Sequence, residues 1–276
     1  MWLTRMQVPF LAIMVTAGAL ASAEAQEAAS AWAKAPKSAA RLIAAPAGEA
    51  PAGEGPYRAG IEIKLAPATI TYWRSPGDSG VPPVFDFSHS SNLRSAEVSF
   101  PAPTRIDEAG SEIFGYERGV VFPVRVTPLE RGKPVDLVLD LDYAACEKIC
   151  LPVHARLELR VPANGASEIP ALAAAEAMVP RQLSAEEIAR DVAIAPVTGE
   201  KPTWRLTWRG APAQDLFAEP PDLFFIETKR ESDGFLVTLA EHPKDKPVPE
   251  QPVRFTLTGP QPVEFTLHLD ASASKP

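Results

Sequence analysis

Residues 134–162 read PVDLVLDLDYAACEKICLPVHARLELRVP, and this stretch decides the fold class. Apolar side chains alternate with polar ones before its centre, from Val135 to Leu141, and again after it, from Val153 to Val161. A period of two residues is typical of a strand with one buried face. The stretch therefore predicts two strands, each with an apolar and a polar side.

Both cysteines of the chain, Cys146 and Cys150, lie between these two strands. Residues four apart on one extended strand are separated by about 13 Å, which is too far for a disulfide. A bonded pair must therefore flank a bend, and Pro152 disfavours a helical turn here. We expect a hairpin in which residues 147–149 form the loop and the cysteines lie opposite each other.

The residues alone leave three chemistries open for this pair. A purely structural bond would close a loop of five residues and add only about 2 kcal/mol of stability. A metal site would need further ligands, but the one nearby imidazole, His154, is expected to face solvent; a Cu(I) site formed by two thiolates stays open. A bond in so tight a loop is expected to be strained and exposed, and such disulfides exchange readily.

The remainder of the sequence favours an all-β protein. Short alternating segments recur between turn-rich pieces such as RSPGDSGVPP and LERGKP. Proline is abundant, 30 of 276 residues, which disfavours long helices. The net charge of −8, without a cluster of Lys or Arg, disfavours nucleic acid and anionic membranes as partners.

The N-terminus has the features of a secretion signal. Arg5 precedes the apolar run VPFLAIMVTAGALA, and small residues suited to cleavage follow. The run is shorter than the roughly 20 residues of a spanning helix. We therefore expect a signal peptide at 1–25, export to the periplasm, and no stable membrane insertion after cleavage.

Composition divides the rest of the chain into four segments. Residues 26–56, rich in Ala, Pro, Gly and Glu, predict a flexible leader in which SAARLIAA could form a brief helical turn. Residues 57–165 predict the first β-domain, 166–194 a helical linker split by Pro180, and 195–272 a second, smaller β-domain. Five aromatic residues of the last segment could pack its core or form a docking surface: Trp204, Trp208, Phe217, Phe224 and Phe225.

A series of motifs resembles a known family over about residues 60–162. The series runs IKLAPATITYWRSPGDSGVPPVFDFSHSSNL, SFPAP, FGYERGVVFPVRV and LDLDYAACEKICLPVHARLEL. In this order it is similar to the N-terminal periplasmic domain of the thiol:disulfide interchange protein DsbD, especially its ScsB-like branch. The resemblance implies an immunoglobulin-like β-sandwich whose cysteine pair cycles between dithiol and disulfide.

The resemblance also implies roles for particular residues. Cys150 would exchange with partners and Cys146 would resolve the mixed disulfide, while Phe114 and Tyr116 would lie in a cap that shields the pair. No cofactor is required. The implied partners are thioredoxin-fold proteins of the periplasm and a membrane or thioredoxin-like electron donor.

Two features depart from the family pattern. The best-known members have a wider spacing between the cysteines, and full-length members continue into a membrane domain and a thioredoxin-like domain that this sequence lacks. Its electron donor would then be a separate protein. Two other functions stay open: a periplasmic binding module with an inert disulfide, and a Cu(I)-handling protein.

Overall fold

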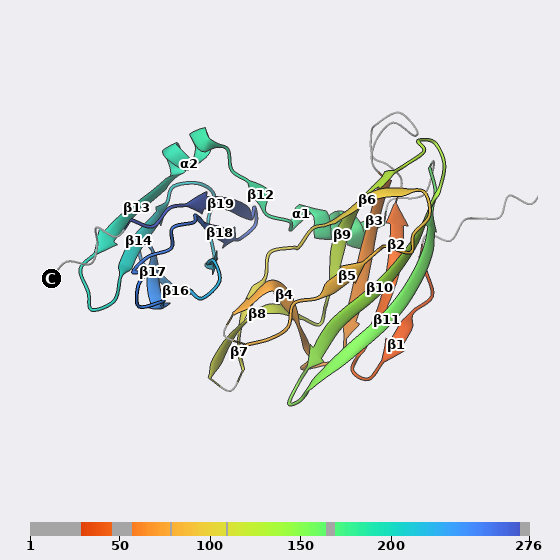
Figure 1. Ribbon diagram of the computed structural model, residues 1–276, viewed down its shortest axis with the longest axis horizontal. Helices are drawn as coiled ribbons and strands as arrows, with labels where there is room; N and C mark the ends of the chain where they lie inside the picture. The colour runs from red at the N-terminus through yellow and green to blue at the C-terminus, as the bar shows by residue number, and fades with distance from the viewer. Residues whose placement is uncertain (1–28, 46–56, 78, 109, 164–168, 271–276) are drawn as a thin grey trace, which may run out of the picture.

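The computed structural model describes residues 29–45, 57–77, 79–108, 110–163 and 169–270, and strands dominate these ranges (Figure 1). The expected signal peptide at 1–25 lies outside them. None of the described helices is long and apolar enough to cross a membrane. The strands form four sheets, two in a first β-unit (β1–β11) and two in a second β-unit (β12–β19). The expected all-β class, an immunoglobulin-like sandwich followed by short helices and a smaller β-unit, is confirmed.

Two sheets face each other in the first β-unit. One has the order β1-β2-β3-β9-β6, and the other β11-β10-β4-β8-β7, with β5 paired to β10. Their inner faces bury one apolar core, to which β2, β3 and β9 contribute from one sheet and β10 and β11 from the other. The bounds are β1 Ala33–Ala35, β2 Ser38–Ala45, β3 Tyr57–Leu65, β4 Ile70–Gly77, β5 Val84–Asp86, β6 Leu93–Val98, β7 Thr104–Glu108, β8 Ser111–Glu117, β9 Gly119–Pro128, β10 Val135–Cys146 and β11 Cys150–Val161.

The predicted hairpin is confirmed. Strands β10 and β11 pair antiparallel along their whole length, from Val135 opposite Val161 to Cys146 opposite Cys150. The alternating apolar residues of both strands are buried and the polar ones between them are mostly exposed or half-buried. Hydrophobic burial on one face therefore sets the register that places the two cysteines opposite each other.

Part of the segment 26–56, which was expected to be a flexible leader, forms strands instead; residues 26–28 and 46–56 lie outside the described ranges. Residues 38–45, SAARLIAA, form strand β2 rather than a helical turn, and β1 pairs with it. Ala40, Leu42 and Ala44 are fully buried, and β2 pairs with β3 from Ser38 opposite Leu65 onwards. Small alanine side chains give a weak strand signal, and the neighbouring strand decides the conformation because it supplies the hydrogen bonds.

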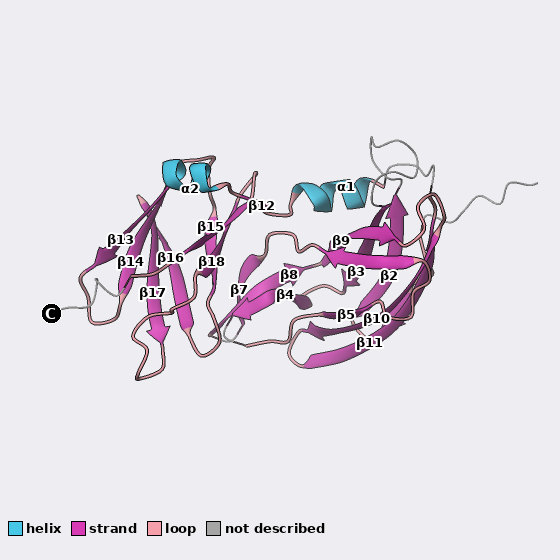
Figure 2. Cartoon of the chain, turned by 45° about the horizontal axis from the view of Figure 1, so that its top comes forward, coloured by secondary structure: helices cyan, strands magenta, loops and turns pink. Residues whose placement is uncertain are grey.

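Two short helices follow β11, as predicted, and Pro180 lies between them (Figure 2). Helix α1 spans Pro170–Ala177 and buries Leu172 against Ile43 of β2. Helix α2 spans Ala185–Asp191 and begins with a capping box formed by Ser184 and Glu187. The short strand β12, Arg181–Gln182, joins the second β-unit through β19.

The second β-unit contains two four-stranded sheets with the orders β12-β19-β18-β15 and β13-β14-β17-β16. Three of the five aromatic residues noted above are buried, namely Trp204, Phe217 and Phe224, whereas Trp208 is half-buried and Phe225 is 48% exposed. Core packing therefore accounts for most of them. The bounds are β13 Val192–Val197, β14 Thr203–Trp208, β15 Asp215–Glu219, β16 Phe225–Glu231, β17 Gly234–Glu241, β18 Val253–Thr258 and β19 Val263–Leu267.

Candidate active site

Cys146 and Cys150 form a disulfide across the end of the β10–β11 hairpin, with their Cα atoms 4.0 Å apart. The two cysteines differ in their strand neighbours. Cys146 lies on an inner strand, paired with Cys150 on one side and with Ile70 of β4 on the other. Cys150 begins β11, which is an edge strand of the sheet.

This difference in position produces a difference in access. Cys146 is 0% exposed, whereas Cys150 is exposed, as are its neighbours Lys148 and Ile149. Thiol–disulfide exchange requires an attacking thiolate to approach one sulfur of the bond. Cys150 is therefore the more accessible of the two cysteines.

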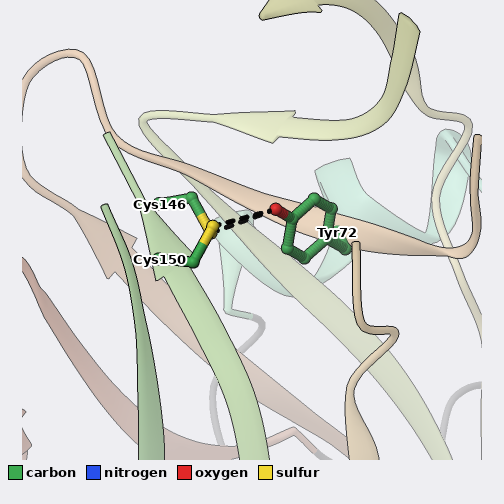
Figure 3. Close-up of a disulfide and its surroundings, with 3 residues drawn as sticks. All are labelled: Tyr72, Cys146 and Cys150. Atoms are coloured by element: carbon green, nitrogen blue, oxygen red, sulfur yellow. Dashed lines mark hydrogen bonds between the residues drawn. A yellow bond between two sulfur atoms is a disulfide. The ribbon is translucent and has the colours of Figure 1, made fainter. Parts of the chain in front are cut away.

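The hydroxyl of Tyr72 contacts both sulfur atoms (Figure 3). Its oxygen lies 3.1 Å from Cys146 Sγ and 3.2 Å from Cys150 Sγ, and the tyrosine is only 3% exposed. A disulfide sulfur accepts hydrogen bonds weakly, but a thiolate accepts them strongly because it is charged. The Tyr72 hydroxyl is thus placed to donate to whichever sulfur becomes a thiolate.

A small apolar cluster surrounds Cys146 on the face opposite the main core. It contains Ile70 and Tyr72 of β4, Ile113 of β8 and Ala144, with Ile106 packed against it. The loop after β4 also covers the tyrosine, since a Cβ at Gly80 would lie 2.5 Å from Tyr72 Cε1. Only a glycine lets the backbone lie this close to the ring, and its φ of +128° favours glycine as well.

The residues expected in a cap, Phe114 and Tyr116, point into the sandwich core, and each is 7% exposed. The Phe114 ring packs edge-on against Phe217 with centroids 4.8 Å apart. The Tyr116 hydroxyl donates to the carbonyl of Pro101, and burial raises the pKa of Tyr116 well above its ordinary value. Because side chains alternate along β8, Ile113 faces Cys146 while Phe114 faces the core. The cap role of Phe114 and Tyr116 stays a prediction.

Charged side chains near the disulfide lie on the hairpin loop and on the β1–β2 turn beside it. Lys37, at the β1–β2 turn, forms a 2.8 Å ion pair with Glu147. The hydrogen bond from Lys37 lowers the pKa of Glu147, so this carboxylate stays ionised near neutral pH. Lys148 is exposed. Its ammonium adds to the lowering of the Glu147 pKa, after the hydrogen bond and charge of Lys37.

His154 is solvent-exposed, as predicted, and its Nδ1 lies 2.9 Å from Asp142 Oδ1. In the described ranges of the chain, no three His, Cys, Asp or Glu side chains gather in a way that could hold a metal ion.

Tyr72 is the site residue that the sequence did not single out. It lies in the motif TITYWR, where a tyrosine and a tryptophan stand side by side in an alternating segment. Adjacent residues of a strand point to opposite faces, so one of the two aromatic residues had to leave the main core. That signal suggests a second buried cluster, but the sequence does not tell which of the two rings belongs to it.

Comparison with known proteins agrees with the resemblance seen in the sequence. The family model described as thiol:disulfide interchange protein DsbD, N-terminal, matches residues 40–162. A comparison with curated proteins found no match.

Among solved structures, the chain is similar to the N-terminal periplasmic domain of ScsB from Proteus mirabilis, with 21% identity and a TM-score of 0.64. The match covers 88% of this chain and 98% of that one, so the shared fold includes the second β-unit. The likeness of residues 40–162 to the N-terminal domain family of the thiol:disulfide interchange protein DsbD is thereby confirmed.

Proposed function

We propose that this protein is a thiol–disulfide exchange module of the periplasm, which carries electrons through the Cys146/Cys150 pair. The observation that carries the proposal is the unequal access of the two sulfurs: one is exposed at a sheet edge, the other is buried, and a tyrosine hydroxyl contacts both. A disulfide that serves only as a staple needs neither an exposed sulfur nor a donor aimed at it. The family match supports the same chemistry.

The accepting step begins when a thiolate of the electron donor attacks Cys150 Sγ. The Cys146–Cys150 bond breaks, and its electron pair leaves on Cys146 as a thiolate, to which the Tyr72 hydroxyl donates. A second thiolate of the donor then attacks the donor's first sulfur, which is bonded to Cys150 Sγ in the mixed disulfide. Cys150 leaves as a thiolate. The donor leaves as a disulfide and the protein as a dithiol, so two electrons have moved.

The delivering step runs the same chemistry towards the acceptor. The Cys150 thiolate attacks the disulfide of a partner, and one partner sulfur leaves as a thiolate. Cys146, deprotonated, then attacks Cys150 Sγ and releases the partner as a dithiol. We propose thioredoxin-fold proteins of the periplasm as acceptors and a membrane or thioredoxin-like protein as donor, in keeping with the matched family.

Removing both cysteines separates the exchange function from a structural one. Cys146→Ala combined with Cys150→Ala should leave the protein folded and lower the free energy of unfolding by about 2 kcal/mol, because the closed loop spans only five residues. Electron transfer to a thioredoxin-fold protein should be lost completely. Urea unfolding followed by circular dichroism, together with a thiol-transfer assay, measures both effects. A variant that is unfolded in the absence of urea would favour a structural staple.

A further inference from the structure

Strand β4, which carries Tyr72, pairs regularly with β8 only as far as that residue. Ile70, Thr71 and Tyr72 lie opposite Glu117, Tyr116 and Gly115, and the next pair is Gly77 with Ile113. The register is therefore irregular from Tyr72 to Gly77. Because ladder hydrogen bonds do not hold this stretch in a regular register, other contacts must fix its position.

An apolar side chain of the second β-unit packs against β4 in this irregular stretch, Tyr72 to Gly77. Phe217 of β15 is 0% exposed and belongs to the core of the first β-unit rather than to that of its own unit. Its ring packs edge-on against Trp73, with centroids 5.9 Å apart, and against Phe114 at 4.8 Å. One side chain of the second β-unit thus completes the packing around the residue that follows Tyr72.

Ion pairs flank this aromatic contact. Arg74 donates from Nε and Nη2 to the two carboxylate oxygens of Glu219, at 2.9 and 2.7 Å, and also contacts Glu264. These side chains are 16–21% exposed, so solvent screens them less than it screens a surface pair. Two-point arginine–carboxylate pairs fix orientation as well as distance.

Arg105 of β7 makes a second connection of the same kind. It donates to both oxygens of Asp215, at 2.9 and 3.0 Å, and to the carbonyl of Leu216 at 2.9 Å. Its guanidinium also lies 5.1 Å from the centre of the Phe217 ring, within the range of a cation–π contact. Three connections, through Phe217, Arg74 and Arg105, therefore join β15 to strands β4, β7 and β8.

We infer that the second β-unit positions Tyr72 on the disulfide by holding strand β4 through Phe217 and Arg74, while Arg105 ties the same strand β15 to β7. Tyr72 and Trp73 point to opposite faces of the strand, so packing Trp73 against Phe217 fixes the rotation of β4 that brings the Tyr72 hydroxyl to the sulfurs. Phe217 is then a positioning residue that acts through Trp73. The inference rests on the proposed exchange function and gives the second β-unit a part in it.

The test compares Phe217→Ala with Phe255→Ala in the full chain. Phe255 is also 0% exposed, but it stacks on Phe265 inside the second β-unit. The readouts are the pKa of the more acidic cysteine thiol, followed by thiolate absorbance in the reduced protein, and the rate at which dithiothreitol reduces the disulfide. We expect Phe217→Ala and Tyr72→Phe each to raise the thiol pKa, because each removes the Tyr72 hydroxyl from the sulfurs. Phe217→Ala should also slow reduction several-fold, whereas Phe255→Ala leaves both quantities unchanged.

A double mutant tests whether Phe217 acts on the thiol pKa through Tyr72. Adding Tyr72→Phe to Phe217→Ala should shift the thiol pKa much less than Tyr72→Phe does alone, since the hydroxyl has already left the sulfurs. If Phe217→Ala does not fold, Arg74→Gln takes its place, because Arg74 of β4 pairs with Glu219 of β15. Arg205→Gln is its control, because Arg205 pairs with Glu231 and Asp233 inside the second β-unit. An unchanged thiol pKa and reduction rate in a folded Phe217→Ala or Arg74→Gln variant would overturn the inference.

The two readouts involve no protein partner, so they distinguish this inference from the proposed function. If the wild-type protein exchanges with thioredoxin-fold proteins but Phe217→Ala behaves like the wild type, only the positioning role fails. If Phe217→Ala shifts the thiol pKa but the wild-type protein exchanges with no such partner, the carrier function fails and the positioning role stands.

Discussion

Replacing Cys146 with alanine should turn the protein into a trap for its partner, whereas replacing Cys150 should not. In the first variant the remaining thiol is Cys150, which is exposed at the edge of the sheet and has no neighbouring thiol to release a captured partner. In the second variant the remaining thiol is Cys146, which is fully buried on an inner strand. Exchange depends on access to the sulfur, so we expect at least about a tenfold difference in trapped complex.

The trapping experiment uses each reduced single mutant with an oxidised thioredoxin-fold protein. Intermolecular disulfides are counted on non-reducing gels after free thiols have been blocked. The double mutant without cysteines is the control for non-specific association. Equal trapping by the two single mutants would contradict the assignment of Cys150 as the exchanging residue.

Tyr72→Phe should raise the pKa of the more acidic cysteine thiol by about 1–2 units, because a hydrogen bond to a charged group is worth about 1.5–3 kcal/mol. The sign follows from the direction of the bond. The hydroxyl donates to the thiolate and favours it over the thiol, so the wild-type pKa is lowered and the variant loses that effect. At neutral pH the variant should hold less thiolate and also lose the donor to the leaving sulfur, which slows exchange about tenfold.

Tyr116→Phe is the matched control for this prediction. Tyr116 is a buried tyrosine on the neighbouring strand β8, but its hydroxyl donates to the carbonyl of Pro101 rather than to sulfur. Thiolate absorbance across a pH titration measures both variants. A Tyr72→Phe protein with the thiol pKa of the wild type would remove Tyr72 from the mechanism, and a Tyr116→Phe protein with a large shift would support a role for the expected cap.

The sequence was sufficient to predict secondary structure where the local pattern was strong and the pairing strand was the next one along the chain. The β10–β11 hairpin follows from two alternating apolar rows, and the separation of α1 from α2 follows from Pro180. Strand β2 was wrongly expected to be helical or flexible, because its buried positions include Ala40 and Ala44, and alanine carries little β-preference. Its conformation comes from pairing with β3, which lies beyond residue 56 in the sequence.

The site was predictable in its cysteines but not in its tyrosine. Cys146 and Cys150 could be recognised from their spacing and from the bend that a bond between them requires. The contact between Tyr72 and the sulfurs depends on pairing of Ile70 with Cys146, a long-range register that no local pattern specifies. The same holds for Phe217, whose packing against Trp73 joins segments more than a hundred residues apart.

The reduction potential of the Cys146–Cys150 bond tests the central claim most directly. The purified protein is equilibrated with glutathione buffers of graded ratio, and the oxidised fraction is measured after alkylation of free thiols. An electron carrier must exchange with the redox couples around it, so we expect a potential above about −300 mV, within reach of glutathione and thioredoxin-type proteins. A potential below about −300 mV, the range of inert structural disulfides, would contradict the account.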